Sequence, residues 1–190
     1  MPRGRLVQIA VVALALMSAG MRSPPAWSGQ DDGRLNGLFE RLKATSMPAE
    51  AKDVEQQIWQ IWLESDDPLV ERLMRQGIAA MSLQQYDLAL ESFDRIVEHA
   101  PRFAEGWNQR ATLHYLMQDY RKSVLDIERT LELEPRHFGA LSGLGQIYDA
   151  LDEPQAALRA FEAALAIDPH LEGIRARVEE LRRQLRGRPT

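Results

Sequence analysis

A proline that recurs every 34 residues constrains this chain more than any other feature. Pro101, Pro135 and Pro169 each follow an apolar segment with the periodicity of a helix. Because proline has no backbone N–H and clashes with the preceding helical turn, each segment should end as a helix close to its proline. Aligned on this spacing, the chain contains three blocks of equal length, at residues 70–103, 104–137 and 138–171.

Four further positions carry matching side chains in the three blocks. In block order, these are Leu73, Trp107 and Leu141 at position 4, Gly77, Ala111 and Gly145 at position 8, Ala89, Ser123 and Ala157 at position 20, and Phe93, Ile127 and Phe161 at position 24. A small residue at position 8 that faces a small residue at position 20 lets two helix backbones approach closely, and the large side chains fill the space on either side. Each block is therefore predicted to form two antiparallel helices, with Tyr86, Tyr120 and Pro154 at one shared position of the turn.

A period of 34 residues, with small, small, large apolar and proline residues at these positions, resembles the tetratricopeptide repeat. The resemblance covers residues 70–171, although Gln76 and Arg110 stand where the family prefers leucine. It implies an all-α fold, in which three helix-turn-helix repeats form a right-handed α–α superhelix or solenoid.

The segments on either side of the blocks are expected to cover the ends of the solenoid. Residues 172–190 are predicted to form a C-terminal capping helix and a tail, because one apolar stripe carries Ile174, Val178, Leu181 and Leu185. Residues 29–69 are predicted to hold a short disordered leader, up to Gly33, and then a divergent helical hairpin at 33–66 that caps the first block.

Residues 1–28 have the layout of a secretory signal peptide. Arg3 and Arg5 precede an apolar run from Leu6 to Met17, and small residues stand before a predicted cut near Gly29. The alternative is an uncleaved membrane anchor, but the run is shorter than the roughly 20 residues that a spanning helix needs. We therefore expect a periplasmic or secreted protein, with membrane association only if the segment is retained.

The charge of the chain argues against a nucleic-acid partner. Cleavage before Gly29 would remove three of the 23 basic residues and none of the 28 acidic ones, so the net charge of −5 would become −8. Binding to phosphate backbones depends on clustered lysine and arginine. The chain also has no cysteine, so disulfide and thiol chemistry are excluded.

The glycines of "SGLGQIY" at 142–148 raise the question of a phosphate-binding loop. No strand pattern precedes them, Tyr148 stands where a dinucleotide fingerprint needs its third glycine, and no Lys-Ser or Lys-Thr follows. We assign these glycines to helix packing. The four histidines are scattered, and no catalytic, metal or cofactor site is predicted. A hydrolase that uses His114 with Asp149 or Ser142 is kept only as a control hypothesis.

The resemblance places the binding surface on the concave face, at positions 2, 5, 9 and 12 of each first helix. Carried over, the candidate groove residues are Glu71, Met74, Ile78, Met81, Glu105, Asn108, Thr112, Tyr115, Ser142, Gln146 and Asp149, with Gly139 beside them. Asn108 and Tyr115 are the best candidates for holding a peptide backbone, because an amide both donates and accepts and a phenol combines apolar area with a polar tip. The alternative for Met74, Ile78 and Met81 is a core buried under residues 33–66.

Two hypotheses for function follow from this surface. The first is a non-catalytic adaptor that binds a peptide or helical segment of a partner protein and assists assembly or maturation in the cell envelope. The second is a structural, self-associating protein whose groove is filled by its own N-terminal hairpin. Binding of a C-terminal carboxylate is not supported, because positions 5 and 9 hold no cation that would pair with it. The partner and the oligomeric state stay open.

Overall fold

The computed structural model describes residues 29–187, which form nine α-helices and one short 3-10 turn and no strand. The predicted signal peptide at 1–28 lies outside these residues. Within the described part of the chain, none of the helices has the length and apolar character needed to span a membrane.

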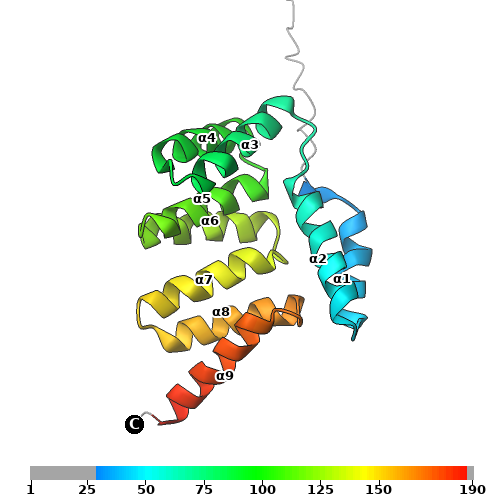
Figure 1. Cartoon of the computed structure of the whole chain (residues 1–190), viewed down its shortest axis with the longest axis vertical. Helices are drawn as coiled ribbons and strands as arrows, with labels where there is room; N and C mark the ends of the chain where they lie inside the picture. The colour runs from blue at the N-terminus through cyan, green and yellow to red at the C-terminus, as the bar shows by residue number, and fades with distance from the viewer. Residues whose placement is uncertain (1–28, 188–190) are drawn as a thin grey trace, which may run out of the picture.

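The three predicted blocks form three helical hairpins. Their helices are α3 (Pro68–Ser82), α4 (Tyr86–His99), α5 (Ala104–Leu116), α6 (Tyr120–Leu133), α7 (Phe138–Ala150) and α8 (Pro154–Ile167). Figure 1 shows the hairpins stacked in chain order along the long axis of the molecule. Each recurring proline follows the second helix of its block within two residues. The predicted all-α solenoid is therefore confirmed.

Small residues hold the two helices of each repeat close together. A Cβ atom built on Gly77 would lie 2.5 Å from the Phe93 ring, and one built on Gly145 would overlap the Phe161 ring. In the second repeat, Ser123 Oγ donates a 2.7 Å hydrogen bond to the backbone carbonyl of Ala111. The glycine at position 8 thus faces the aromatic ring of position 24 in the first and third repeats, and in the second repeat the serine at position 20 lies against the backbone of position 8.

The turn inside each repeat has the same backbone shape three times. Gln84, Gln118 and Asp152 have φ angles of 57°, 61° and 54°, in the left-handed region, and all three stand at position 15 of their block. The backbone N–H of the next residue bonds back to a carbonyl five positions earlier, as between Asp119 and His114 (2.9 Å). This common shape ends the first helix and starts the second at the same place in every repeat.

Helix α9 (Glu172–Gly187) closes the C-terminal end of the stack. Val178 and Leu181 are buried on it and pack with Phe161 and Ala157 of the third repeat. Arg177 adds an ion pair to Asp149, with nitrogen–oxygen distances of 2.7 and 2.5 Å. The apolar stripe predicted for a terminal helix is therefore the face that α9 buries.

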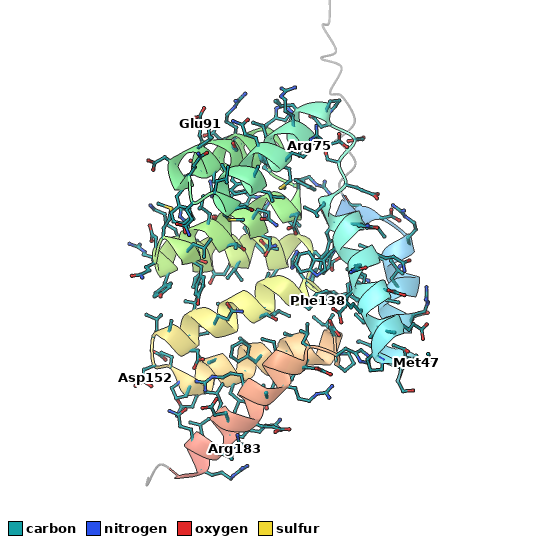
Figure 2. The ribbon with its side chains drawn as sticks, in the orientation of Figure 1. Met47, Arg75, Glu91, Phe138, Asp152 and Arg183 are labelled. Atoms are coloured by element: carbon teal, nitrogen blue, oxygen red, sulfur yellow. The ribbon has the colours of Figure 1, made fainter. Side chains whose placement is uncertain are left out.

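The N-terminal hairpin, α1 (Arg34–Ala44) and α2 (Pro48–Leu63), does not cap the first repeat as predicted. Figure 1 shows it beside the stack, and its core includes Phe138, Ile167 and Leu171, which all belong to the third block or its end. Figure 2 shows Phe138 at the boundary between the hairpin and the repeats. The hairpin therefore lies along the stack instead of extending it.

The predicted disordered leader is also wrong from Gly29 onward. Gly29–Asp31 forms a 3-10 turn, and Gly29, Gln30 and Asp32 are buried. The Gly29 N–H donates to the carbonyl of Glu64 (3.2 Å), and the glycine lies so close to the backbone of Ile61 that a side chain would overlap it. A glycine in the sequence favours a flexible segment, but here the missing side chain is what allows the close contact.

Candidate protein-binding groove

The N-terminal hairpin and the 3-10 turn that precedes it are attached to all three turns that end the repeats. The hydrogen bonds run from Gln30 Nε2 to the Arg102 carbonyl (2.5 Å), from Arg136 Nη1 to Asn36 Oδ1 (2.9 Å) and from His170 Nε2 to the Leu42 carbonyl (3.0 Å). Arg102, Arg136 and His170 occupy the same position, 33, of the three blocks. The guanidinium of Arg136 also lies over the ring of Phe39, 4.5 Å from its centre. The N-terminal segment, turn and hairpin together, thus contacts three successive repeats.

An aromatic cluster joins α2 to the start of α7. Trp62 is buried and stacks on the imidazole of His137, with ring centres 4.0 Å apart and planes 11° apart. Trp59 meets Phe138 edge-on at 5.6 Å, and its ring would touch any side chain placed at Gly139. These contacts fix α2 against the first helix of the third repeat.

A buried polar network lies behind this cluster. His137 is the N-terminal cap of α7, and its Nδ1 accepts the Ala140 N–H (3.1 Å). Nε2 therefore carries the hydrogen and donates it to Glu105 Oε2, 2.9 Å away. Asn108 Nδ2 donates to the same carboxylate at 3.2 Å. The repeat position predicts that Glu105 belongs to the binding surface. The structure instead places it in the interior of the protein.

A groove with a volume of about 410 Å³ opens on the first-helix face of the second and third repeats. Five predicted residues line it, namely Asn108, Thr112, Tyr115, Ser142 and Gln146, and so does Gly139. Two further walls were not predicted: Glu55 and Trp59 of α2, and Leu171 and Ile174 at the start of α9. The repeat pattern does not predict these walls, because it does not determine which repeat the flanking helices pack against.

The other predicted groove residues lie elsewhere. Glu71, Met74 and Ile78 line a separate hollow of about 380 Å³, together with Leu63 at the end of α2. Met74 is buried, and Ile78 and Met81 pack partly buried against the core of the first repeat. Met74 is therefore a core residue, as the alternative interpretation predicts. Of residues 33–66, it is the end of α2, at Leu63, that lies near Met74. Asp149 is held in its ion pair with Arg177.

Glu55 is the one charged side chain that lines the 410 Å³ groove among the described residues. Its neighbour Asp168 is fully buried; Asp168 Oδ1 accepts the His170 N–H (2.9 Å), while Oδ2 has no hydrogen-bond donor in the described structure. Burial and then the nearby Asp168 carboxylate raise the pKa of Glu55. Burial likewise raises the pKa of Asp168. Glu55, on the wall of the groove, therefore stands next to a buried carboxyl group, that of Asp168, in a site that disfavours the ionised forms of both.

The residues of the control hypothesis, a hydrolase, are not assembled. His114 lies in a different hollow with Arg110 and Asp126, and burial lowers its pKa. Ser142 lines the groove and donates its hydroxyl hydrogen to the Phe138 carbonyl (2.8 Å). Among residues 29–187, no cluster of three or more histidine, aspartate or glutamate residues is arranged as metal ligands.

Comparison with known proteins agrees with the repeat geometry. The family model of the tetratricopeptide repeat matches residues 74–120 and 108–172. A TPR repeat-containing protein of Rhizobium etli is 37% identical over 157 residues, which cover 83% of this chain and 77% of that protein. The small glutamine-rich tetratricopeptide repeat-containing protein 2 of Saccharomyces cerevisiae is 28% identical over 79% of this chain, which spans only 43% of that protein.

Two solved structures share the fold. The first TPR domain of Spaghetti (RPAP3), bound to the HSP90 peptide SRMEEVD, superposes with a TM-score of 0.61 and 17% identity, over 64% of this chain and 97% of that one. MamA superposes with a TM-score of 0.56 and 20% identity, over 80% of this chain and 81% of that one. At these identities, the likeness concerns the arrangement of the helices alone.

Proposed function

Because the chain belongs to the tetratricopeptide repeat family, we propose that it is a non-catalytic adaptor that binds a segment of a partner protein. The binding site in this proposal is the groove between α5, α7, α2 and the start of α9. A role in assembly or maturation in the cell envelope follows if residues 1–28 direct export, as their charge and apolar pattern suggest.

The observation that carries the proposal is the composition of the groove. Its walls combine apolar area from Trp59, Leu171 and Ile174 with the polar groups of Gln146 and Tyr115. Sites that bind a ligand typically join a mainly apolar concave wall to a few polar groups that fix its orientation. A volume of about 410 Å³ accommodates side chains of an extended or helical segment.

The relatives support the interaction role in general. One of them carries a peptide in its structure, that of HSP90, and others are named as Hsp70-Hsp90 organizing proteins. Those names describe those proteins. For this chain, they support a module that binds other proteins, without indicating which protein.

The competing hypothesis, a groove filled by the N-terminal hairpin, is less well supported. The hairpin contributes Glu55 and Trp59 to one wall and leaves the 410 Å³ hollow between itself and the repeats. A binding site that remains open in the folded chain favours an external ligand over self-association.

A photo-crosslinking experiment in the native envelope tests the proposal. A benzophenone amino acid replaces Gln146 in the groove, and a matched control replaces Gln155, which is exposed on α8. We expect a distinct partner band from position 146 alone, and its loss when Tyr115 is changed to alanine. Equal labelling from both positions, or none from position 146, would reject the groove as the binding site. N-terminal sequencing of the exported protein, expected to start near Gly29, tests the localisation.

A further inference from the structure

We propose that the groove selects a partner segment by a lysine or arginine side chain, whose cationic group binds the Glu55 carboxylate at the edge of the groove beside Asp168. This inference rests on the proposed function and specifies the chemistry of its partner. It predicts the opposite preference to that of a repeat domain that binds an acidic tail.

Charge complementarity is the first support. Among the described residues, the lining of the groove contains one carboxylate, Glu55, and no lysine, arginine or histidine. An acidic segment in this groove would place like charges together, whereas a cationic side chain would form a charge-assisted hydrogen bond. The net charge of the chain, −5, acts in the same direction at longer range.

A comparison between two repeat turns gives the second support. Glu134 and Asp168 are buried acids at the same position, 31, of the second and third blocks. Arg136 Nε and Nη2 bond both carboxylate oxygens of Glu134, each at 3.0 Å. In the third block, His170 stands at the position of Arg136, and its Nε2 is hydrogen-bonded to the Leu42 carbonyl instead of to Asp168. Asp168 therefore lacks the cation that its counterpart has: in the described structure no N–H group donates to its Oδ2, and the side chain that it meets is another carboxyl group, that of Glu55.

The basic groups near the two carboxyls do not belong to the lining of the groove. Lys52 of α2 and His170 are the basic residues that act on Glu55, and the repulsion from Asp168 is larger than the attraction of either one. Glu55 also lines a neighbouring hollow, where the other charged or titratable residues are Lys52, His170, Glu172 and Arg175. Burial is the main cause of the raised pKa values of Glu55 and Asp168, and for Glu55 the repulsion from the Asp168 carboxylate adds to it. A cation from a partner would stabilise both ionised forms.

The wall next to Glu55 suits the rest of a basic side chain. Trp59 stands four residues after Glu55 on α2, so the two side chains share one face of the helix. Its half-buried ring lines the groove together with Leu171 and Ile174. An aliphatic stem can pack on this apolar area, and a guanidinium or ammonium group can lie over the indole ring while it bonds the carboxylate.

The test uses two small probes of equal shape and different charge. N-acetyl-arginine amide carries the guanidinium, and N-acetyl-citrulline amide replaces it with a neutral urea. In an NMR titration of the whole chain, we expect the arginine probe to shift the Trp59 indole N–H and the Glu55 amide, with an affinity about tenfold above that of citrulline. Glu55→Gln should remove this difference. Asp53→Asn, an exposed change on the same helix, should retain it.

The outcomes separate this inference from the proposed function. If arginine and citrulline shift Trp59 equally, or if Glu55→Gln leaves the arginine preference unchanged, the cation site is wrong. A crosslinked partner at position 146 would then still support the adaptor. If the arginine preference is found but no partner is crosslinked, the cation site stands and the adaptor is rejected. Circular dichroism of Glu55→Gln, expected to match the unaltered chain, excludes unfolding as the cause.

Discussion

The repeat stack and the N-terminal hairpin are held in place by two different kinds of contact. Inside the repeats, one arrangement recurs: Gly77 meets Phe93, and Gly145 meets Phe161, in both cases 16 residues apart. Between the N-terminal segment and the three repeat turns, the contacts differ from turn to turn: an amide to a carbonyl, a guanidinium over a phenyl ring and an imidazole to a carbonyl. The three hydrogen bonds join residues 72, 100 and 128 positions apart.

The difference shows which part of such a fold has a local origin. A repeat buries a side chain against a partner at a fixed distance along the chain, so its packing depends on nearest neighbours. The packing of the N-terminal segment depends on contacts with three turns, and these turns come close together only after the repeats have stacked. Two separately stabilised units should therefore respond differently to substitution.

The largest effect is expected from Trp62→Ala at the hairpin junction. Loss of a buried tryptophan costs about 3–5 kcal/mol, and Trp62 packs on His137, Phe138 and Phe39. We expect α1 and α2 to lose protection from amide hydrogen exchange, while α7 and α8 retain theirs. Trp62→Phe should cost much less, because the indole N–H has no hydrogen-bond partner in the described structure. Equal loss of protection in all helices would show that the two units fold as one.

An effect of intermediate size should come from the pair Gly145→Val and Gly143→Ala on α7. A side chain at Gly145 would overlap the Phe161 ring, and such overpacking costs about 1–3 kcal/mol. A Cβ atom at Gly143 would lie 3.7 Å from Ile127, an ordinary contact. Alanine there should stabilise the helix by about 0.5–1 kcal/mol. Chemical denaturation measures both changes, and an unchanged or increased stability of Gly145→Val would contradict the assignment of Gly145 as the packing residue.

A small effect, of opposite sign to the first, is expected from Asp168→Asn. Its amide can still accept the His170 N–H and can also donate to Glu55, so a buried acceptor without a donor is removed. We expect a gain of about 1 kcal/mol at pH 7, the lower end of the cost of such an atom.

The gain should depend on pH in a defined direction. Because burial raises the pKa of Asp168 in the folded protein, the folded state holds this proton more tightly than the unfolded state. Asp168 therefore destabilises the protein at neutral pH, and this penalty disappears as the pH falls through the raised pKa. Thermal melting of both proteins from pH 7 to pH 4 should show the difference in stability shrinking. A difference that stays constant over this range would contradict the proposed ionisation.

Much of the fold could be predicted from the sequence, and less of the site. The period placed Gly145 against the second helix of its repeat, because the partner of a repeat residue lies at a constant separation. The resemblance to the tetratricopeptide repeat, and not the period itself, indicates that Thr112, Ser142 and Gln146 share one groove, and all three line it. It placed Glu105 there as well, but His137, at the start of the next repeat, draws that carboxylate into the interior.

The walls contributed by Trp59 and Ile174 could not be predicted, for a physical reason. Their helical patterns show that each lies on a helix, yet nothing local determines onto which repeat a segment outside the period folds. That choice depends on the aromatic cluster around His137 and on the residues at position 33 of each block, which become neighbours only after the stack has formed. Gly29 is a similar case, since its close contact with Ile61 requires α2 to be in place.

The attachment of the N-terminal segment to three consecutive turns has a mechanical consequence. A solenoid bends through small rotations between adjacent units, and these rotations accumulate along its length. The N-terminal segment, from the 3-10 turn through the hairpin, is hydrogen-bonded to the ends of all three units. It therefore opposes rotation between them. The hollow that it borders should thus keep its width before a ligand arrives, so that little ordering entropy is lost on association.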